Sequence, residues 1–444
     1  MVPGGAHTGT GLQPLRGTPS DGRRGPRGLH KQKRTMRSKL LSRPPRIESV
    51  VRAVVLGAGG LGRILTVELA ADPRIDSVVI ADKRGDRARA LKVLGNASSL
   101  EAVEADVTDA ASLRRVLSGA NVVVNATLPE HNLRIMEGCL EAGSGYVDSA
   151  GYNPDAVGGK GSVLDQLALD PTWRQRGATA IVSMGSDPGI SNIMARVASD
   201  RFATIDRILV RKAATGDKAT DGFPLYSREI FLRDALAHPV VWDGAAFAER
   251  EPASGEETYR FPAPIGTRRV HWFRHEEVLT LPSRLGKPIG WVDYKHDIRP
   301  ELVRAIVSLQ ALGLLSPSHV WRFGSAQVPF RDAFLAMFPE PSTLVGPIGG
   351  ALGIVVEVHG SPSDGGPSAV RASLMMEHRD ANRRRGTTAE RFLTAAAMVS
   401  AVALILEKRV PRAGVLAPEE LPPALILPEL EDRGVKFQIE ALAA

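Results

Sequence analysis

Beyond residue 50 the chain alternates short apolar runs with segments that have helical spacing. The run VRAVVL is followed by a helical pattern that stops at Pro73, and the same rhythm continues to about residue 200. Short strands that alternate with helices form right-handed βαβ units and a parallel sheet. We therefore predict a doubly wound α/β domain over residues 50–200, with six strands at 51–56, 77–82, 101–106, 121–126, 145–150 and 179–184.

The pattern changes after Ser199. Residues 201–380 contain β-like runs, such as RILVRKAA and GIVVEVHG, with short helical pieces between them. This mixture predicts a second, α+β domain with a mainly antiparallel sheet. The stretch at 388–409 is apolar nearly all round, which predicts a buried helix, and we expect residues 381–444 to pack back on the first domain.

The basic charge of the chain is concentrated at its start. The formal net charge of the 444 residues is +7, but residues 1–50 hold 11 Lys and Arg against 2 Asp and Glu, so the remainder is nearly neutral. This leader has no apolar segment of the kind found in secretory signals. We predict a disordered leader over residues 1–49, or upstream sequence ahead of a start at Met36. A nucleic-acid-binding arm or an organelle address is the alternative. We favour the disordered leader, because composition alone cannot specify a partner.

The chain has one cysteine, Cys139, which excludes a disulfide within it and a cysteine-based zinc site. No run approaches 18 uncharged apolar residues, so the sequence predicts no helix that crosses a membrane. We therefore expect a cytoplasmic protein that binds neither nucleic acid nor membranes.

The first predicted strand runs into a glycine-rich turn, VVLGAGGLG. Its glycines form the pattern G-x-G-x-x-G between a strand and a helix, which permits a tight turn, the approach of a pyrophosphate and close helix packing. Asp82 ends the second strand, where a carboxylate accepts hydrogen bonds from ribose hydroxyls. This predicts a Rossmann site that favours NAD, although Lys83 and Arg84 could bind the 2′-phosphate of NADP. The residues expected to bind the cofactor here are Gly57, Gly59, Gly60, Leu61, Gly62 and Asp82.

The loops after the third and fourth strands offer further cofactor contacts. Asp106 could border the adenine or share the N-cap of the next helix with Thr108 and Asp109. Ligands of open parallel sheets bind beyond the carboxyl ends of the strands. The segment NATLPEHN is therefore expected beneath the nicotinamide, with His131 either catalytic or merely part of the first helical turn. The residues expected to contact the cofactor in these loops are Asp106, Asn125, Thr127, Leu128 and Pro129.

The sixth strand ends in a second glycine turn, GSDPGISN. We predict that a helix begins at Asp187 and Pro188, because Pro fits the first helical position and Asp is a natural N-cap. A strand that leads into a glycine turn and a helix N-terminus forms an anion pocket. This turn lies at the same sheet edge as the first, so Asp187, Pro188 and Gly189 are expected to face the substrate. Alternatively, the Asp187 carboxylate only caps its own helix.

The segments GAGGLG, ADVTD, NATLPEHN, YVDSAG and GSDPGISN occur in the order and spacing of the saccharopine dehydrogenase-like proteins. Among these, the chain most resembles bacterial lysine 6-dehydrogenases. The resemblance continues through HEEVLTLP, VDYKHDIRPEL and LQALGLLS and covers roughly residues 50–438. It implies a Rossmann domain, an inserted substrate domain and often a homodimer. It also implies hydride transfer between a nicotinamide and a carbon that bears nitrogen in an amino acid or imine.

Such a reaction needs a cation for the substrate carboxylate and a base for the amine proton. The possible cations in the second domain are Arg211, Lys212, Arg228 and Arg274, of which we name Arg211 as substrate-binding, together with Glu276. The candidates for the base are Asp148, His275, Glu276 and Lys295, of which we name Asp148, His275 and Lys295 as catalytic. His271 and His275 have the spacing of a helical metal pair, but their flanks indicate a strand, and we predict no metal site.

The sequence thus predicts an NAD(P)-dependent oxidoreductase that acts on CH–NH or CH–NH2 groups, of the lysine 6-dehydrogenase or saccharopine dehydrogenase type. One alternative is NADPH-dependent reductive condensation of an aldehyde with an amine, as in opine or carboxylated polyamine formation. Another is a nucleotide-binding regulator without catalysis. The glycine motif does not separate these alternatives, because binding and turnover both need it.

Overall fold

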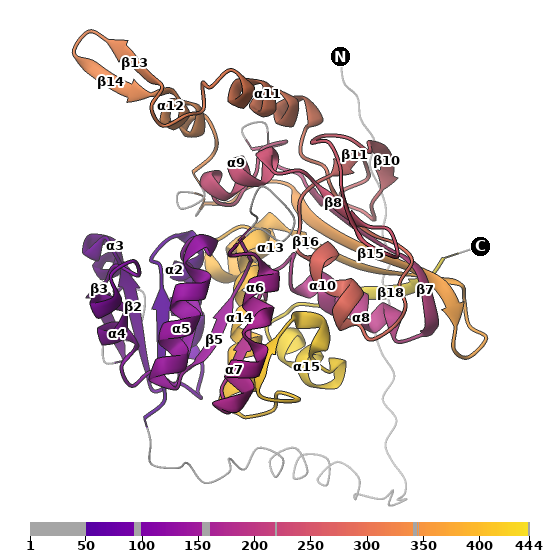
Figure 1. Cartoon of the computed structure of the whole chain (residues 1–444), viewed down its shortest axis with the longest axis horizontal. Helices are drawn as coiled ribbons and strands as arrows, with labels where there is room; N and C mark the ends of the chain where they lie inside the picture. Colours follow the sequence, from indigo (N-terminus) through magenta and orange to yellow (C-terminus); the bar gives the residue numbers. More distant parts are fainter. Residues whose placement is uncertain are drawn as a thin grey trace, which may run out of the picture. The chain divides into compact units, whose positions relative to one another are not determined.

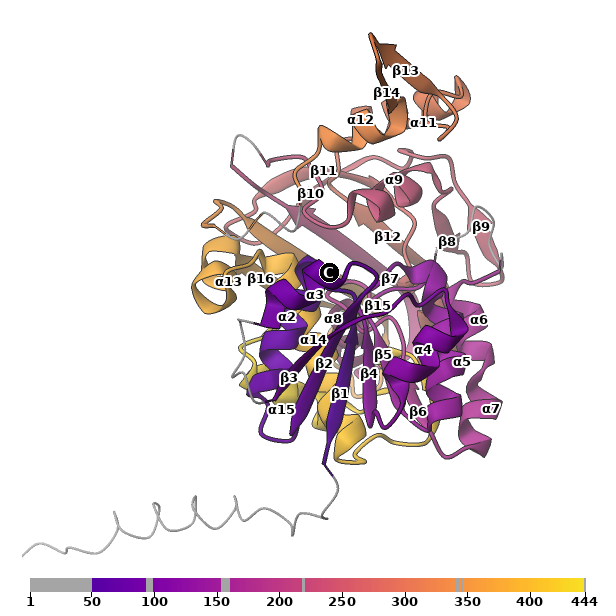
Figure 2. The same cartoon turned by 90° about the vertical axis from the view of Figure 1, so that its left-hand side faces the viewer.

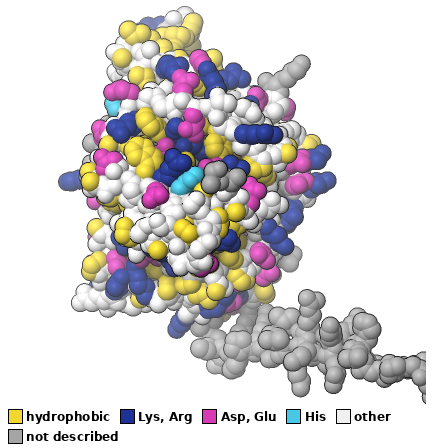
Figure 3. Space-filling view, turned by 90° about the vertical axis from the view of Figure 1, so that its right-hand side faces the viewer, with side chains coloured by type: hydrophobic (Ala, Val, Ile, Leu, Met, Phe, Trp, Pro, Cys, Tyr) yellow, Lys and Arg dark blue, Asp and Glu magenta, His cyan; other side chains and the backbone are white. Residues whose placement is uncertain are grey.

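The computed structural model describes residues 50–92, 99–152, 160–217, 220–340, 344 and 346–442. The predicted leader at 1–49 lies outside these residues. Two sheets organise the described part, one parallel and one largely antiparallel (Figure 1). On the face drawn in Figure 3, Lys and Arg side chains are interspersed with Asp and Glu, as expected for a region with nearly balanced charge.

The first sheet has seven parallel strands in the order β17-β6-β5-β4-β1-β2-β3. The central strands are runs of buried Val, Ile and Ala, because helices cover both faces of the sheet (Figure 2). The predicted doubly wound α/β fold is confirmed. The strands are β1 (Arg52–Leu56), β2 (Ser77–Asp82), β3 (Leu100–Glu104), β4 (Val122–Asn125), β5 (Gly145–Asp148), β6 (Thr179–Ile181) and β17 (Gly414–Leu416).

The helices on this sheet follow the predicted apolar spacing. Helix α2 packs against α14 on one side of the sheet, whereas α5 packs against β4 and β5 on the other. The helices of this part are α2 (Gly60–Ala71), α3 (Gly85–Leu91), α4 (Ala110–Leu117), α5 (Asn132–Ala142), α6 (Val163–Ala168), α7 (Asp170–Gln175) and α8 (Ile190–Ser199), with the 3-10 turn η2 (Pro129–His131).

The second sheet has nine strands, and most of its pairs are antiparallel, as predicted; β12 and β7 pair in parallel. Its long central strands β7 and β15 carry buried residues on both faces. The strands are β7 (Phe202–Ala214), β8 (Val240–Trp242), β9 (Phe247–Glu249), β10 (Glu257–Arg260), β11 (Thr267–Trp272), β12 (Val292–His296), β15 (Ala351–Pro362), β16 (Ala369–Glu377) and β18 (Gln438–Ala441).

A hairpin arm projects from this second sheet at the top of Figure 1. The arm consists of β13 (Val320–Phe323), β14 (Ala326–Pro329) and α12 (Phe330–Ala336), and it follows helix α11 (Pro300–Ala311). The remaining elements are α9 (Arg228–Leu236), α10 (Glu277–Arg284), α13 (His378–Arg385), α14 (Ala389–Leu406), η4 (Pro418–Glu420) and α15 (Pro423–Asp432).

Helix α14 is long and apolar enough to cross a membrane by length and composition alone, but 78% of its 18 residues are buried inside the protein. It packs against α2, β4, β5 and α15. The helix is therefore part of the core, as its uniformly apolar pattern predicted.

Candidate active site

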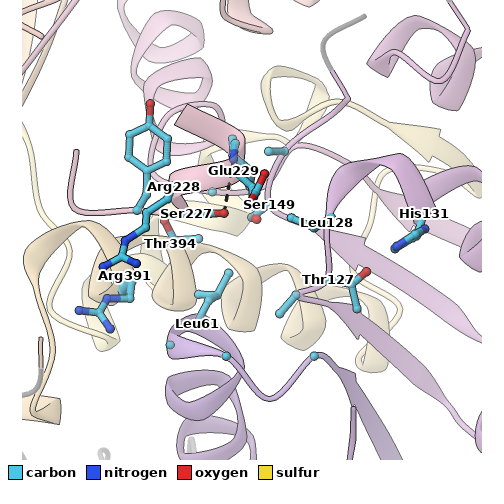
Figure 4. Close-up of a pocket in the computed structure, with 18 of the residues that line it drawn as sticks. Leu61, Thr127, Leu128, His131, Ser149, Ser227, Arg228, Glu229, Arg391 and Thr394 are labelled. Atoms are coloured by element: carbon cyan, nitrogen blue, oxygen red, sulfur yellow. Dashed lines mark hydrogen bonds between the residues drawn. The ribbon is translucent and has the colours of Figure 1, made fainter. Parts of the chain in front are cut away.

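A cavity of about 990 Å³ lies between the carboxyl edge of the parallel sheet and the second sheet. Figure 4 shows its two sides: Leu61, Thr127 and Leu128 come from the first part of the chain, and Arg228 comes from α9. Arg391, in the first turn of α14, lies beside Leu61. Ligands bind at this edge of open parallel sheets.

The glycine turn forms the floor of the cavity and needs its glycines. Gly57 has a φ of +100°, and a Cβ there would lie 2.6 Å from the carbonyl oxygen of Ala126. A Cβ on Gly62 would lie 1.8 Å from the carbonyl oxygen of Gly57, so the helix packs directly on the turn. A Cβ on Gly59 would meet no described heavy atom within 4 Å, which leaves room for a phosphate. The turn therefore fits a dinucleotide.

Asp82 lines the cavity, and both of its carboxylate oxygens are bonded to the backbone. Oδ2 accepts a hydrogen bond from the N–H of Ala58 at 2.7 Å, and Oδ1 accepts one from the N–H of Arg84 at 2.8 Å. Asp82 thereby joins the glycine turn to the end of β2. Three exposed cations lie on the cavity beside it, Lys83, Arg84 and Arg87.

Asp106 lines the cavity as well. Its Oδ1 accepts hydrogen bonds from the backbone N–H and the hydroxyl of Thr108, and the hydroxyl bond is the main reason that the pKa of Asp106 is lowered. The cap of α4 is Asp109, whose side chain accepts from the N–H of Ala111. The capping role that Asp106 was expected to share therefore belongs to Asp109, and Asp106 faces the cofactor region.

The loop after β4 lines the cavity through Thr127, Leu128 and His131, whereas the described lining leaves out the predicted contacts Asn125 and Pro129. Asn125 is buried, and its Oδ1 accepts hydrogen bonds from the N–H and hydroxyl of Thr127 at 2.9 and 2.7 Å. Direct contact by Asn125 was a wrong prediction, since its side chain shapes the loop that makes the contact.

The sequence predicted that a helix begins at Asp187 in the turn after β6. The structure contradicts this prediction. The N–H of Gly185 bonds to the carbonyl oxygen of Pro188 at 2.7 Å, and Gly189 has a φ of +126°, far from helical values. The peptide bond between Asp187 and Pro188 is cis, and α8 begins only at Ile190. The Asp187 carboxylate is therefore not used as a cap, and Asp187 and Pro188 line the cavity, whereas Gly189 is buried and is not part of the described lining.

Asp187 is part of a buried cluster of charges. Its Oδ2 lies 2.9 Å from Lys212 Nζ and accepts a hydrogen bond from the hydroxyl of Tyr294 at 2.6 Å; Lys212 Nζ also lies 3.0 Å from Glu390 Oε1. Burial opposes the charge on Asp187, but Lys212 and His275 outweigh it and lower the pKa. Burial raises the pKa of Glu390. Of the two carboxylates, Asp187 keeps its charge more strongly.

His275 and Glu276 line the cavity beside this cluster. His275 stacks on Tyr294 at 3.9 Å, and its Nδ1 lies 2.5 Å from Glu277 Oε2. Burial opposes protonation of His275, but Glu277 and Glu276 outweigh it and raise the pKa to about 9. Glu276 accepts a hydrogen bond from the N–H of Gly151 at 2.7 Å, and burial raises its pKa to about 7. Glu276 can therefore exchange a proton near neutral pH.

His275, Glu276 and Glu277 bring three potential metal ligand atoms within 4.8 Å of one another. The hydrogen bond between His275 and Glu277, and those from Gly151 to Glu276 and from Ser191 to Glu277, already engage these groups. His271 does not join them, because its ring nitrogens lie 2.9 and 2.8 Å from the carbonyl oxygens of Trp272 and Ile298. The cluster is explained by contacts within the protein.

The predictions of Arg211 and Lys295 as site residues were wrong by one position each. On β7 and β12, Arg211 pairs with Lys295, and the next pair is Lys212 with His296. Successive side chains of a strand point to opposite faces. Lys212 and His296 line the cavity, whereas the described lining includes neither Arg211 nor Lys295.

On the far face of the sheet, Arg211 and Lys295 have partners of their own. Arg211 donates to Asp293 Oδ1 and to Glu257 Oε1, both at 2.6 Å, and Lys295 donates to Glu257 Oε2 at 2.6 Å. These ion pairs hold strands β7, β10 and β12 together.

Asp148 was also predicted to be catalytic, and the structure contradicts this. Its Oδ1 accepts from the N–H of Ser183 and its Oδ2 from Gln166 Nε2, both at 2.6 Å, and only 1% of the residue is exposed. Burial raises its pKa to about 6. Among the described residues that line the cavity it does not occur, so it joins β5 to the segment after β6 instead.

Several residues of the cavity could not be named from the sequence. Glu390 and Arg391 begin α14, where charged residues open an otherwise apolar helix; that contrast was a usable signal. Arg228 and Lys212 were considered only as members of a larger set. No local pattern marks Tyr226, which reaches the cavity from the loop before α9 and lies near Lys212.

The fold, the glycine turn and the cavity fit an enzyme that binds a dinucleotide cofactor. Residues 53–181 match the family model of the saccharopine dehydrogenase NADP binding domain. The solved saccharopine dehydrogenase (L-Glu forming) from Saccharomyces cerevisiae has the same fold, with a TM-score of 0.66 and 18% identity over 88% of this chain and 100% of that one. The chain thus resembles saccharopine dehydrogenases in its dinucleotide-binding domain and in its fold, which confirms the predicted resemblance. It is an oxidoreductase that depends on a nicotinamide dinucleotide.

Two curated relatives are named for amine substrates or products other than saccharopine. The chain is 23% identical to the carboxyaminopropylagmatine dehydrogenase of Synechocystis sp. over 395 residues, which cover 87% of this chain and 97% of that one. It is 25% identical to the carboxynorspermidine synthase of Vibrio cholerae over 309 residues, which cover 65% and 73%. Both names describe carboxyl-bearing amines.

Proposed function

We propose that the protein forms a carboxylated polyamine or a similar secondary amine by reductive condensation of an aldehyde with an amine. The observation that carries the proposal is the position of Glu276, a buried acid with a pKa of about 7 in the same cavity as the glycine turn. The names of the two curated relatives support this substrate class over lysine itself. The reaction was an alternative in the sequence analysis, and it now becomes the first choice.

The amine nitrogen adds to the aldehyde carbon, and loss of water gives an imine; bound NADPH would supply the hydride that reduces it. Loss of water from the adduct needs a proton on the departing hydroxyl, and Glu276 is placed to donate it. We assign Arg228, which lines the cavity and is paired with Glu340 at 3.3 Å, to the carboxylate of the substrate. The acidic residues Glu229, Asp234 and Asp332 also line the cavity and suit the far end of a cationic amine, although Glu229 is already paired with Arg331.

We propose NADP(H) rather than NAD(H) as the cofactor. Asp82 uses both oxygens on the backbone N–H groups of Ala58 and Arg84, and the exposed cations Lys83, Arg84 and Arg87 lie on the cavity next to it. A 2′-phosphate needs such cations. The description of the matching family model supports the same choice.

The test follows the absorbance of the reduced nicotinamide with purified protein. NADPH or NADH is mixed with pairs of an aldehyde and a polyamine, a diamine or agmatine; NAD and NADP are mixed separately with lysine and saccharopine. Consumption of NADPH only when aldehyde and amine are both present supports the proposal. Turnover of lysine with NAD would return the protein to the lysine 6-dehydrogenase reaction. Cofactor binding without turnover on either panel would contradict both and favour a regulator.

The predicted homodimer and cytoplasmic location remain predictions. Sedimentation velocity of the purified protein tests the first, and imaging of the tagged full chain tests the second.

A further inference from the structure

The side chain of Arg391 reaches from the last third of the chain to the glycine turn at its start. Arg391 lies in the first turn of α14, which packs against α2. A Cβ on Gly60 would lie 2.7 Å from Arg391 Nη1, and the two residues line the same cavity. Figure 4 shows the guanidinium beside Leu61, at the start of α2.

This guanidinium is buried, and among the described residues no carboxylate forms an ion pair with it. The residue is 6% exposed, and it donates to the carbonyl oxygen of Leu344 at 3.0 Å and to Thr388 Oγ1 at 3.4 Å. Burial, helped by Arg63, lowers its pKa to about 10, although the charges of Glu340 and Glu390 oppose this shift. A buried charge is costly unless it is paired, so an anion would complete this site.

The surroundings indicate which anion this is. The N-terminus of the 12-residue helix α2 presents free N–H groups at the same place, and there is open space beside Gly59. We propose that Arg391 binds the pyrophosphate of the dinucleotide across from the helix N-terminus. Helix α14, which packs against α2, would then contribute a cation to the same site as the glycine turn. The inference needs only a bound dinucleotide and holds whichever amine is the substrate.

The test uses the full chain and three variants. Arg391→Gln removes the charge, Arg391→Lys keeps it without the planar fork, and Arg383→Gln is the control, because the side chain of Arg383 on the neighbouring helix α13 is 74% exposed. Dissociation constants are measured by fluorescence for NADPH and NADH and by calorimetry for ADP-ribose, which keeps the pyrophosphate, and for AMP, which has a single phosphate.

We expect Arg391→Gln to weaken NADPH, NADH and ADP-ribose about tenfold or more, and AMP clearly less. Arg391→Lys should be intermediate, and the control should match the unmodified protein. The melting temperature of Arg391→Gln without ligand should stay the same or rise, since an unpaired buried charge is removed.

Unchanged dissociation constants in both Arg391 variants would overturn the proposal. Normal cofactor binding with a raised KM for the substrate would assign Arg391 to the substrate carboxylate. Failure of ligand-free Arg391→Gln to fold would also overturn it, because the charge would then be part of the protein's own framework. Loss of turnover on every amine, with cofactor binding as expected here, would contradict only the proposed reaction.

Discussion

Lys212 holds Asp187 and Glu390 together through one buried ammonium group, at 2.9 Å from the first carboxylate and 3.0 Å from the second. Asp187 lies in the turn after β6, Lys212 in β7 and Glu390 in α14. Burial opposes the charge of Lys212, but the two carboxylates outweigh it and raise the pKa. Lys212 therefore fixes three parts of the cavity wall relative to one another.

Lys212→Met should lower the free energy of unfolding by about 3 kcal/mol or more, because removing one member of a buried ionic cluster leaves uncompensated charge. Urea denaturation followed by circular dichroism measures this. Lys295→Met is the matched control. Lys295 precedes His296, the residue of β12 that pairs with Lys212, and its partner Glu257 has a side chain that is 33% exposed. An equal loss of unfolding free energy in the two variants would show that the buried cluster stabilises the protein no more than the ion pair of Lys295 with Glu257.

The proposed role of Glu276 predicts the pH dependence of turnover. Its pKa of about 7 means that the proton it donates in the reductive direction is lost as the pH rises through 7. The reductive kcat should therefore fall above about pH 7, and the oxidative direction should show the opposite limb. Glu276→Gln should lower kcat by about 100-fold and abolish this limb. A variant that keeps the limb near pH 7 would exclude Glu276 as the proton donor.

The raised pKa of Glu276 also makes the stability of the protein depend on pH. The pKa of Glu276 in the folded protein lies above its ordinary value of 4.5, so folding favours the neutral carboxyl. The contribution of Glu276 to stability is complete below about pH 4.5 and is lost as the pH rises through 7. The difference in free energy of unfolding between the protein and Glu276→Gln, measured from pH 4.5 to 8, reports this loss; a flat difference would contradict the raised pKa.

The cofactor preference can be tested at the end of β2. Replacing Lys83 and Arg84 together by Ala should raise the KM for NADPH about tenfold or more and leave the KM for NADH nearly unchanged, because only NADPH carries a 2′-phosphate. Arg89→Ala is the control, as Arg89 lies on α3 outside the described cavity lining. If both cofactors were weakened alike, these cations would not read the 2′-phosphate.

The dinucleotide half of the site could be predicted from the sequence because its contacts are local. The glycines and the β2 carboxylate follow one another at fixed spacing, and steric limits at Gly57 and Gly62 leave no other residue type. The sequence predicted that Asn125 contacts the cofactor, but its side chain bonds to Thr127 of its own loop. An Asn that bonds its own loop has the same local sequence as one that bonds a ligand, so the sequence could not separate the two.

The substrate half could not be predicted at the level of single residues. Residues 210–213 of β7 are buried on both faces, so no polar and apolar alternation shows which of these side chains point to the cavity. A shift of one position exchanges Arg211 for Lys212 and Lys295 for His296. Glu390 reaches the site from a helix far along the chain, and its ion pair with Lys212 depends on tertiary packing alone.

Strand β17 completes the parallel sheet beside β6, although eight of the nine strands of the second sheet are encoded between them. On the ribosome, β6 therefore has an unpaired edge until Gly414–Leu416 has been synthesised. Unpaired strand edges invite association with other chains. A truncated message or a protease that ends the chain before residue 414 would leave a product with a complete glycine motif but without β17. We expect this product to aggregate through the open edge of β6 rather than to act as a smaller enzyme.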